Sequence, residues 1–156
     1  MRHCLRKTAG AAVAALMGCV CALAACAPSE EAGLQAELVA SDETHVVIEV
    51  TAGDPAYSLY DVLTLFVENG EISMEGSESE YGFYITSVNG TQADTESYWA
   101  VYTTLETMDG VRYSNPTYGT WSYEGRELAS ASYGVSGLPA VTGEVYALVF
   151  TSLASA

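Results

Sequence analysis

The hydrophobic and polar positions separate an uninterrupted apolar segment near the start of the chain from alternating patterns after residue 45. Residues 45–51 place Val46, Ile48 and Val50 on one face and are rich in β-branched side chains, so they predict a strand. Residues 59–69 instead carry apolar side chains at helical spacing, and Ser58 with Asp61 resembles a capping box. We therefore expect a helix of about eleven residues before Asn69-Gly70, which is a typical helix end.

The rest of the chain has the pattern of strands joined by short turns. Apolar and polar side chains alternate over five further segments, residues 80–88, 98–105, 118–123, 127–133 and 144–152. Asn89-Gly90, Asp109-Gly110 and Glu124-Gly125 are pairs that favour tight turns. One helix near the start of the domain, followed by closely spaced strands, predicts an α+β fold with a mostly antiparallel sheet.

The apolar segment has the layout of a secretory signal peptide. Arg2, Arg6 and Lys7 precede an uncharged run over residues 9–25. Leu23-Ala24-Ala25-Cys26 resembles the lipobox of bacterial lipoproteins, which implies cleavage after residue 25 and a lipid on the Cys26 thiol. Two acyl chains would hold the protein stably on the extracytoplasmic face of the cell membrane. The alternatives are an ordinary secretory signal or an uncleaved anchor, although the run is near the lower limit for spanning a bilayer.

Removal of residues 1–25 would leave an acidic chain with few reactive groups. Arg112 and Arg126 would be the only basic side chains left besides His45, while all twenty acidic residues would remain. Two minus twenty gives a formal charge of −18, with His45 neutral. Such a charge repels phosphate backbones, so we expect no nucleic-acid partner. A solvated, self-repelling surface is the simplest interpretation of this charge, and a cationic ligand is the alternative. Three cysteines would leave with the signal and Cys26 would carry lipid, so no disulfide is expected.

The domain organisation follows from the same composition. Residues 26–44 are polar, acidic and poor in aromatic side chains, which predicts a flexible linker with a reach of about 23 Å. Within it, residues 34–39 are compatible with a helical turn. The folded domain is expected over residues 45–156.

The residues after position 26 offer little for catalysis. They contain one histidine, His45, no lysine and no free thiol, and no pair of carboxylates stands out, so we expect a protein that is not an enzyme. The same inventory excludes a metal site built on nitrogen or sulfur ligands. The acidic residues between positions 75 and 96 do not have the spacing of a calcium-binding loop, which favours a solvated acidic loop. No cofactor is expected to be required.

Aromatic residues are the main indication of function. All eleven tyrosines and both tryptophans follow residue 26, and several lie in a polar, glycine-rich region where core packing explains them less well. Tyrosine and tryptophan combine a large apolar surface with a polar group, which suits recognition. The candidate ligand-binding residues are Tyr98, Trp99, Tyr102, Tyr118, Trp121 and Tyr123.

Four ordered segments carry a resemblance to one family. Residues 58–63, 85–90, 97–102 and 137–146 resemble the transcobalamin-like C-terminal domain of vertebrate cobalamin carriers and many bacterial surface lipoproteins. The resemblance implies a β-grasp-like fold, with residues 106–134 as an insertion. It also implies a cobalamin or related corrinoid as ligand, bound or presented to a transporter. Because the carriers enclose the ligand with a separate helical domain, this chain would supply half a site.

A second hypothesis assigns the chain to another class. The insertion at residues 106–134 is rich in tyrosine, tryptophan, serine and glycine. An exposed patch of this composition is typical of a protein-binding surface. The chain would then be a surface adaptor or adhesin that docks an envelope protein through this insertion.

Overall fold

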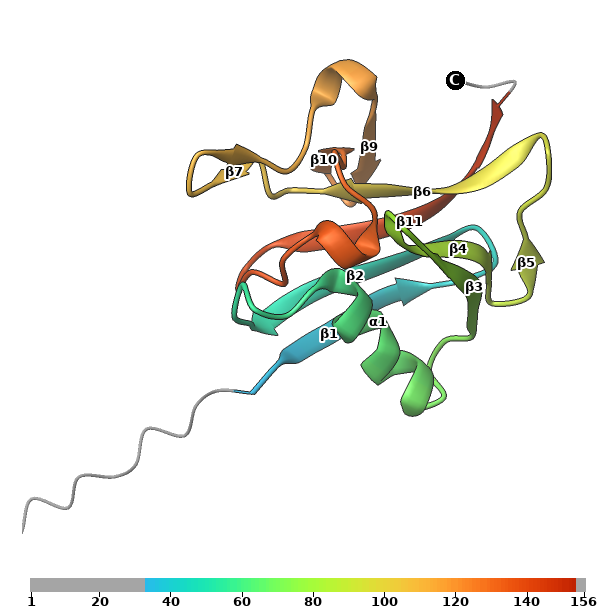
Figure 1. Ribbon diagram of the computed structural model, residues 1–156, viewed down its shortest axis with the longest axis horizontal. Coiled ribbons are helices and arrows are strands. Elements are labelled where there is room, and N and C mark those ends of the chain that lie inside the picture. The colour runs from blue at the N-terminus through green and yellow to red at the C-terminus, as the bar shows by residue number, and fades with distance from the viewer. Residues whose placement is uncertain (1–32, 154–156) are drawn as a thin grey trace, which may run out of the picture.

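The computed structural model describes residues 33–153, in which a six-stranded antiparallel sheet carries one α-helix on one face (Figure 1). The order of strands across the sheet is β1-β2-β11-β6-β10-β9. The prediction of a mostly antiparallel sheet with one helix near its start is confirmed. The strands of this sheet are β1 (Gln35–Ser41), β2 (His45–Ala52), β6 (Ser97–Thr103), β9 (Thr120–Tyr123), β10 (Arg126–Ser130) and β11 (Val145–Ser152).

Two smaller sheets flank the main one. A three-stranded sheet follows the helix and a two-stranded hairpin follows β6. The turn of this two-stranded hairpin is Asp109-Gly110, as predicted, and both residues have positive φ. The strands of the smaller sheets are β3 (Met74–Ser79), β4 (Gly82–Val88), β5 (Thr91–Gln92), β7 (Thr107–Met108) and β8 (Val111–Arg112), and the two 3-10 turns are η1 (Pro116–Tyr118) and η2 (Val135–Gly137).

Helix α1 (Leu59–Glu68) begins where the sequence predicts. The Ser58 hydroxyl accepts a hydrogen bond from the Asp61 backbone N–H at 3.3 Å, and the Asp61 carboxylate accepts one from the Ser58 N–H at 2.7 Å. These two bonds complete the capping box, which satisfies donors that the first helical turn leaves unpaired. The start of the helix is also joined to the segment that follows η2, because the Leu59 N–H donates to the Leu138 carbonyl at 2.7 Å.

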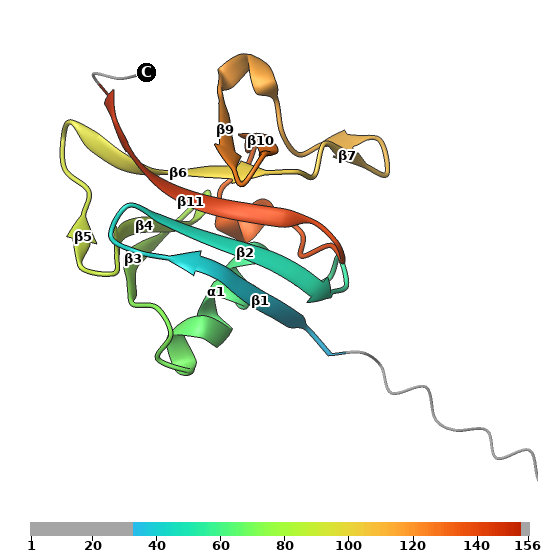
Figure 2. The same cartoon turned by 180° about the vertical axis from the view of Figure 1, so that it is seen from behind.

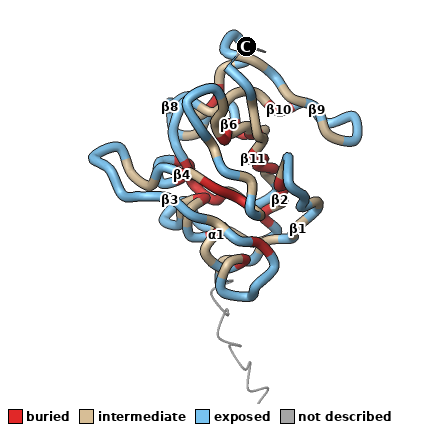
Figure 3. The backbone as a smooth tube through the Cα atoms, turned by 90° about the vertical axis from the view of Figure 1, so that its right-hand side faces the viewer, coloured by how far each residue is buried: buried red, intermediate tan, exposed pale blue. Residues whose placement is uncertain are grey.

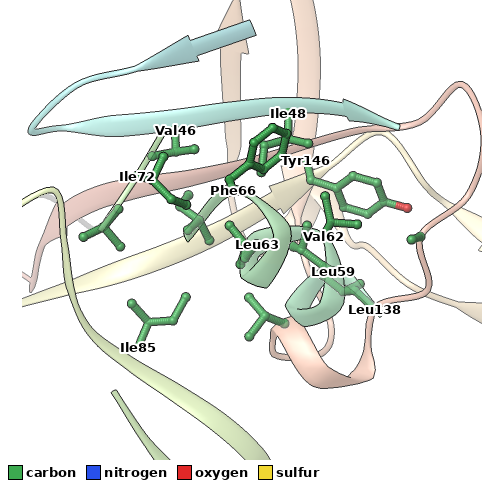
Figure 4. Packing of buried hydrophobic residues seen from close by; sticks show 14 of the residues in the cluster. Val46, Ile48, Leu59, Val62, Leu63, Phe66, Ile72, Ile85, Leu138 and Tyr146 are labelled. Carbon is green, nitrogen blue, oxygen red and sulfur yellow. The ribbon is translucent and has the colours of Figure 1, made fainter. Parts of the chain in front are cut away.

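The main core lies between α1 and one face of the sheet (Figure 4). Val46, Ile48 and Val50 of β2 point to this side, as their alternation predicts, and pack in one cluster with Leu63 and Phe66 of the helix. We call the opposite side of the sheet its outer face. Figure 3 shows that the buried positions gather between the sheet and α1, while the ends of the hairpins are exposed.

Strand β1 corrects the expected linker. Residues 35–41 pair antiparallel with β2, so the expectation of a flexible segment up to residue 44 was wrong for them, as was the possible helical turn over residues 34–39. The reason is that side chains of this segment alternate between the two faces of the sheet. Ala36 and Leu38 pack against the main core, while Glu37 faces away from it. The folded domain therefore includes β1 and extends at least as far as Gln35, ten residues before the expected start at residue 45.

Candidate functional site

Residues 106–134 extend the main sheet through the β9–β10 hairpin (Figure 2). Strand β10 pairs with β6 through only two residue pairs, Ala129↔Thr103 and Ser130↔Tyr102. The hairpin then bends over the outer face, where Leu128 packs in a second small core with Val47 and Ala147. The segment is thus part of the folded domain and covers the side of the sheet opposite α1.

An ion pair joins the end of this hairpin to β2. Arg126 Nη1 lies 3.0 Å from Glu49 Oε2, and both side chains remain partly exposed. Glu124 and Gly125 form the predicted turn, with positive φ at both residues. Because an exposed ion pair contributes at most about 1 kcal/mol, the apolar packing beneath it supplies most of the attachment.

Four aromatic rings meet on the outer face, and we call this group the aromatic surface. It consists of His45, Tyr102, Trp121 and Tyr123, all half-buried. The centroid of the Trp121 ring lies 5.6 Å from His45, 5.9 Å from Tyr123 and 6.4 Å from Tyr102. The Trp121 and Tyr123 rings are nearly parallel, with 19° between their planes. Strands β2, β6 and β9 therefore place their aromatic side chains in one continuous contact area.

Local electrostatics distinguish two groups at this surface. Burial raises the pKa of Tyr102 above its ordinary value, and the neighbouring Tyr98 phenol adds to the shift. Hydrogen bonds from Thr44 and from the His45 backbone N–H lower the pKa of Asp42. That carboxylate lies 3.2 Å from His45 Nδ1, so the ring of His45 has an acceptor beside it.

A small hollow opens beside the aromatic surface. Its volume is about 100 Å³, with Val47, Leu128 and Val145 at its base and the Glu49–Arg126 ion pair in its wall. Pockets that enclose a small molecule typically measure about 300–1,000 Å³. This region can therefore contact a flat ligand or a partner surface from one side, but it does not enclose a ligand.

The structure brings together only some of the predicted site residues. Tyr102, Trp121 and Tyr123 belong to the aromatic surface, and Tyr98 lies on the same face of β6 because it is four residues from Tyr102. Tyr118, in η1, is 76% exposed and its ring contacts no other ring in the described part of the chain.

Trp99 does not belong to the aromatic surface, because its side chain packs in the main core. It is only 6% exposed, its Nε1–H donates to the Thr91 carbonyl at 3.1 Å, and its ring lies 5.4 Å from that of Phe150. Most of its surface is therefore used within the core, and it also lines a hollow of about 180 Å³ with Phe83 and Val135, apart from the aromatic surface. The sequence interpretation also missed His45, which meets Trp121 only because the β9–β10 hairpin folds back over β2.

Within residues 33–153, no group of three or more histidine, cysteine, aspartate or glutamate side chains is arranged to hold a metal ion. None of the helices over that range has the length and apolar character needed to cross a membrane. The predicted signal peptide and Cys26 lie outside the described residues. In comparisons with known proteins, no family model and no curated protein matches the chain.

Proposed function

We propose that the chain is a non-catalytic binding protein, anchored through a lipid on Cys26 at the extracytoplasmic face of the cell membrane. The observation that carries the binding role is the aromatic surface, in which rings from three strands form one half-exposed area. Rigid aromatic side chains supply contact area at a small cost in conformational entropy. The resemblance to a lipobox at Leu23-Ala24-Ala25-Cys26 carries the anchoring part of the proposal.

A corrinoid such as cobalamin is the first ligand of this proposal, together with a β-grasp-like classification of the fold. The hairpin β1–β2 before the helix and the central position of β11 favour that classification, although β2 and β11 run antiparallel. The stacked rings of Trp121 and Tyr123 offer an aromatic contact area for one side of a macrocycle. A half-site open on one side agrees with a ligand that a second protein, such as a transporter, covers or receives.

A protein partner is the second candidate, which makes the chain an adaptor or adhesin. The observation that favours it is the small volume of the adjacent hollow, about 100 Å³. Aromatic side chains surrounded by exposed polar groups, here Glu49 and Arg126, are typical of protein interfaces. The contact would then be made on the surface of the hairpin rather than inside a pocket.

Replacing Trp121 with alanine tests the role of the aromatic surface. If a corrinoid binds there, calorimetric titration with cobalamin and cobinamide should show affinity weakened about ten-fold or more, because stacking area is lost. Tyr81→Ala is the matched control, since Tyr81 is 88% exposed in the turn before β4, and it should change nothing. Absence of heat from the intact chain at millimolar corrinoid would end the corrinoid proposal.

The protein-partner alternative uses the same two variants. The intact chain should enrich an envelope protein from extract, and Trp121→Ala should lose it while Tyr81→Ala retains it. Equal enrichment by both variants would remove the aromatic surface from the proposal.

Replacing Cys26 with serine tests the anchor separately. The variant should move from the membrane fraction to the soluble extracytoplasmic fraction and lose labelling by fatty acid, because a hydroxyl does not replace the thiol that would carry the lipid. The measurement is fractionation with an antibody against the folded domain. Unchanged membrane retention and labelling of Cys26→Ser would contradict lipidation at this residue.

A further inference from the structure

Strand β1 leaves one backbone edge of the main sheet open. It is the outermost strand on its side of the sheet and pairs with β2. Within residues 33–153, its backbone N–H and C=O groups make no hydrogen bond to any other element. Alternate backbone groups of an edge strand point away from its neighbour, so this edge can pair with a further strand.

A furrow runs along this edge beside the helix. Figures 1 and 2 both place α1 next to β1, and a hollow of about 570 Å³ lies between them. Five consecutive residues, 34–38, line it together with Leu65 and Phe66 of the helix. Because consecutive residues alternate in direction, a hollow lined by all five reaches the backbone edge of β1, and Thr51 of β2 lines it as well. A second hollow of about 400 Å³ continues past Leu34 and Leu65.

The furrow combines an apolar base with acidic walls. Leu65 lines both hollows and is 37% exposed. It belongs to α1, the only α-helix of the described residues. No lysine, arginine or histidine lines either hollow. The carboxylates that line them are Glu37, Asp61, Glu68 and Glu71. This arrangement attracts a segment that carries both apolar and cationic side chains, and it repels a second copy of this acidic chain.

We propose that the furrow binds an extended, cationic peptide segment of a partner protein, which adds as a strand to the edge of β1. Such strand addition uses backbone hydrogen bonds for affinity and alternate side chains for specificity. Apolar side chains of the segment face Leu65 and Phe66, and its lysines or arginines face Glu37. This site goes beyond the proposed function, because the aromatic surface occupies the other side of the sheet.

The geometry of β1 also limits the length of the paired segment. Pairing with β2 is irregular between Gln35 and Ala36 and again between Leu38 and Ala40, which leaves Ala36–Leu38 in regular register. Bulges of this kind bend an edge strand and restrict its pairing. The partner strand therefore pairs over a short stretch, and the side-chain contacts in the furrow supply the remaining affinity.

The test uses the full chain in phosphatidylcholine nanodiscs and a fluorescent, end-blocked peptide of four Leu-Lys repeats. Fluorescence anisotropy measures binding, with empty nanodiscs subtracted. A second peptide carries N-methyl groups on all its backbone nitrogens, so it keeps the side chains but cannot donate the backbone bonds. We expect the unmodified peptide to bind at least ten-fold more tightly. Equal binding of both peptides, or no binding of the unmodified one at millimolar concentration, would overturn the proposal.

Protein variants separate the furrow from general charge attraction. Leu65→Asp and the pair Glu37→Lys/Glu71→Lys should each weaken binding at least ten-fold. The control pair Glu75→Lys/Glu78→Lys makes the same charge change on exposed positions of β3, and it should change affinity less than two-fold. An equal loss in both pairs would reduce the effect to net charge. Light scattering that shows a dimer dissociated by Leu65→Asp would assign the edge to a second copy and reject the peptide.

Discussion

Replacing Leu63 with alanine is expected to lower the free energy of unfolding by about 2–5 kcal/mol. Leu63 is fully buried at the centre of α1 and packs with the apolar side of β2, including Val46 and Ile48 (Figure 4). Alanine is the better helix former, so the loss comes from the cavity and not from the helix itself. Urea unfolding followed by tryptophan fluorescence measures the change.

A matched position lies two residues along the same helix. Leu65 is 37% exposed, so Leu65→Ala should lower the free energy of unfolding by less than about 1 kcal/mol. Since small domains are stable by only about 5–15 kcal/mol, the Leu63 variant should lose a large part of its stability and the Leu65 variant little. Similar losses at the two positions would mean that α1 does not pack on the sheet through the face that carries Leu63.

The central elements of the fold were predictable because each carries a complete local pattern. Strand β2 and helix α1 bury one full face each, so their periods of two and of about four residues are plain in the sequence. Ser58 and Asp61 mark the start of the helix through bonds within four residues. Information of this kind does not depend on the rest of the chain.

The edge strands could not be predicted in the same way. Strand β3 exposes five of its six residues, and β1 packs through side chains as small as Ala36. Their stability comes from pairing with β4 and β2, which supply half of the backbone hydrogen bonds. A polar segment of this kind has the composition of a linker, and only its neighbour in the sheet decides its structure.

The candidate site was predictable as residue types and not as an arrangement. Alternation places Trp121 and Tyr123 on one side of β9, as observed. Their contact with His45 depends on a hairpin that returns to a strand far earlier in the sequence, where Arg126 meets Glu49. Alternation also separates Trp99 from Tyr98 and Tyr102, but it does not say which side faces the main core.

The second large effect concerns pH and arises at Tyr146. This side chain of β11 is almost fully buried, its hydroxyl donates to the Pro139 carbonyl at 2.5 Å, and it accepts from the Val141 N–H at 3.2 Å. Burial raises its pKa from 10.0 to about 12; the Val141 hydrogen bond opposes the shift and the Glu144 carboxylate adds to it. The folded protein therefore holds the phenolic proton more tightly than the unfolded chain does.

The sign of the pH effect follows from that difference. The contribution of Tyr146 to stability is complete below pH 10 and is lost as the pH rises from 10 to about 12. Two units of pKa correspond to about 3 kcal/mol. Tyr146→Phe lacks the titrating group but leaves the Pro139 carbonyl and the Val141 N–H without this partner, which should cost about 1–3 kcal/mol at pH 8.

The free energies of unfolding of the two proteins should therefore converge in alkali. The other ten tyrosines are common to both proteins, so the difference between them isolates Tyr146. Urea unfolding at intervals from pH 8 to 12 should show the stability advantage of the native chain shrinking above pH 10. Tyr81→Phe, which removes a hydroxyl from solvent, should follow the native chain throughout. A constant advantage across this range would mean that Tyr146 keeps its proton no better in the folded state than in the unfolded one.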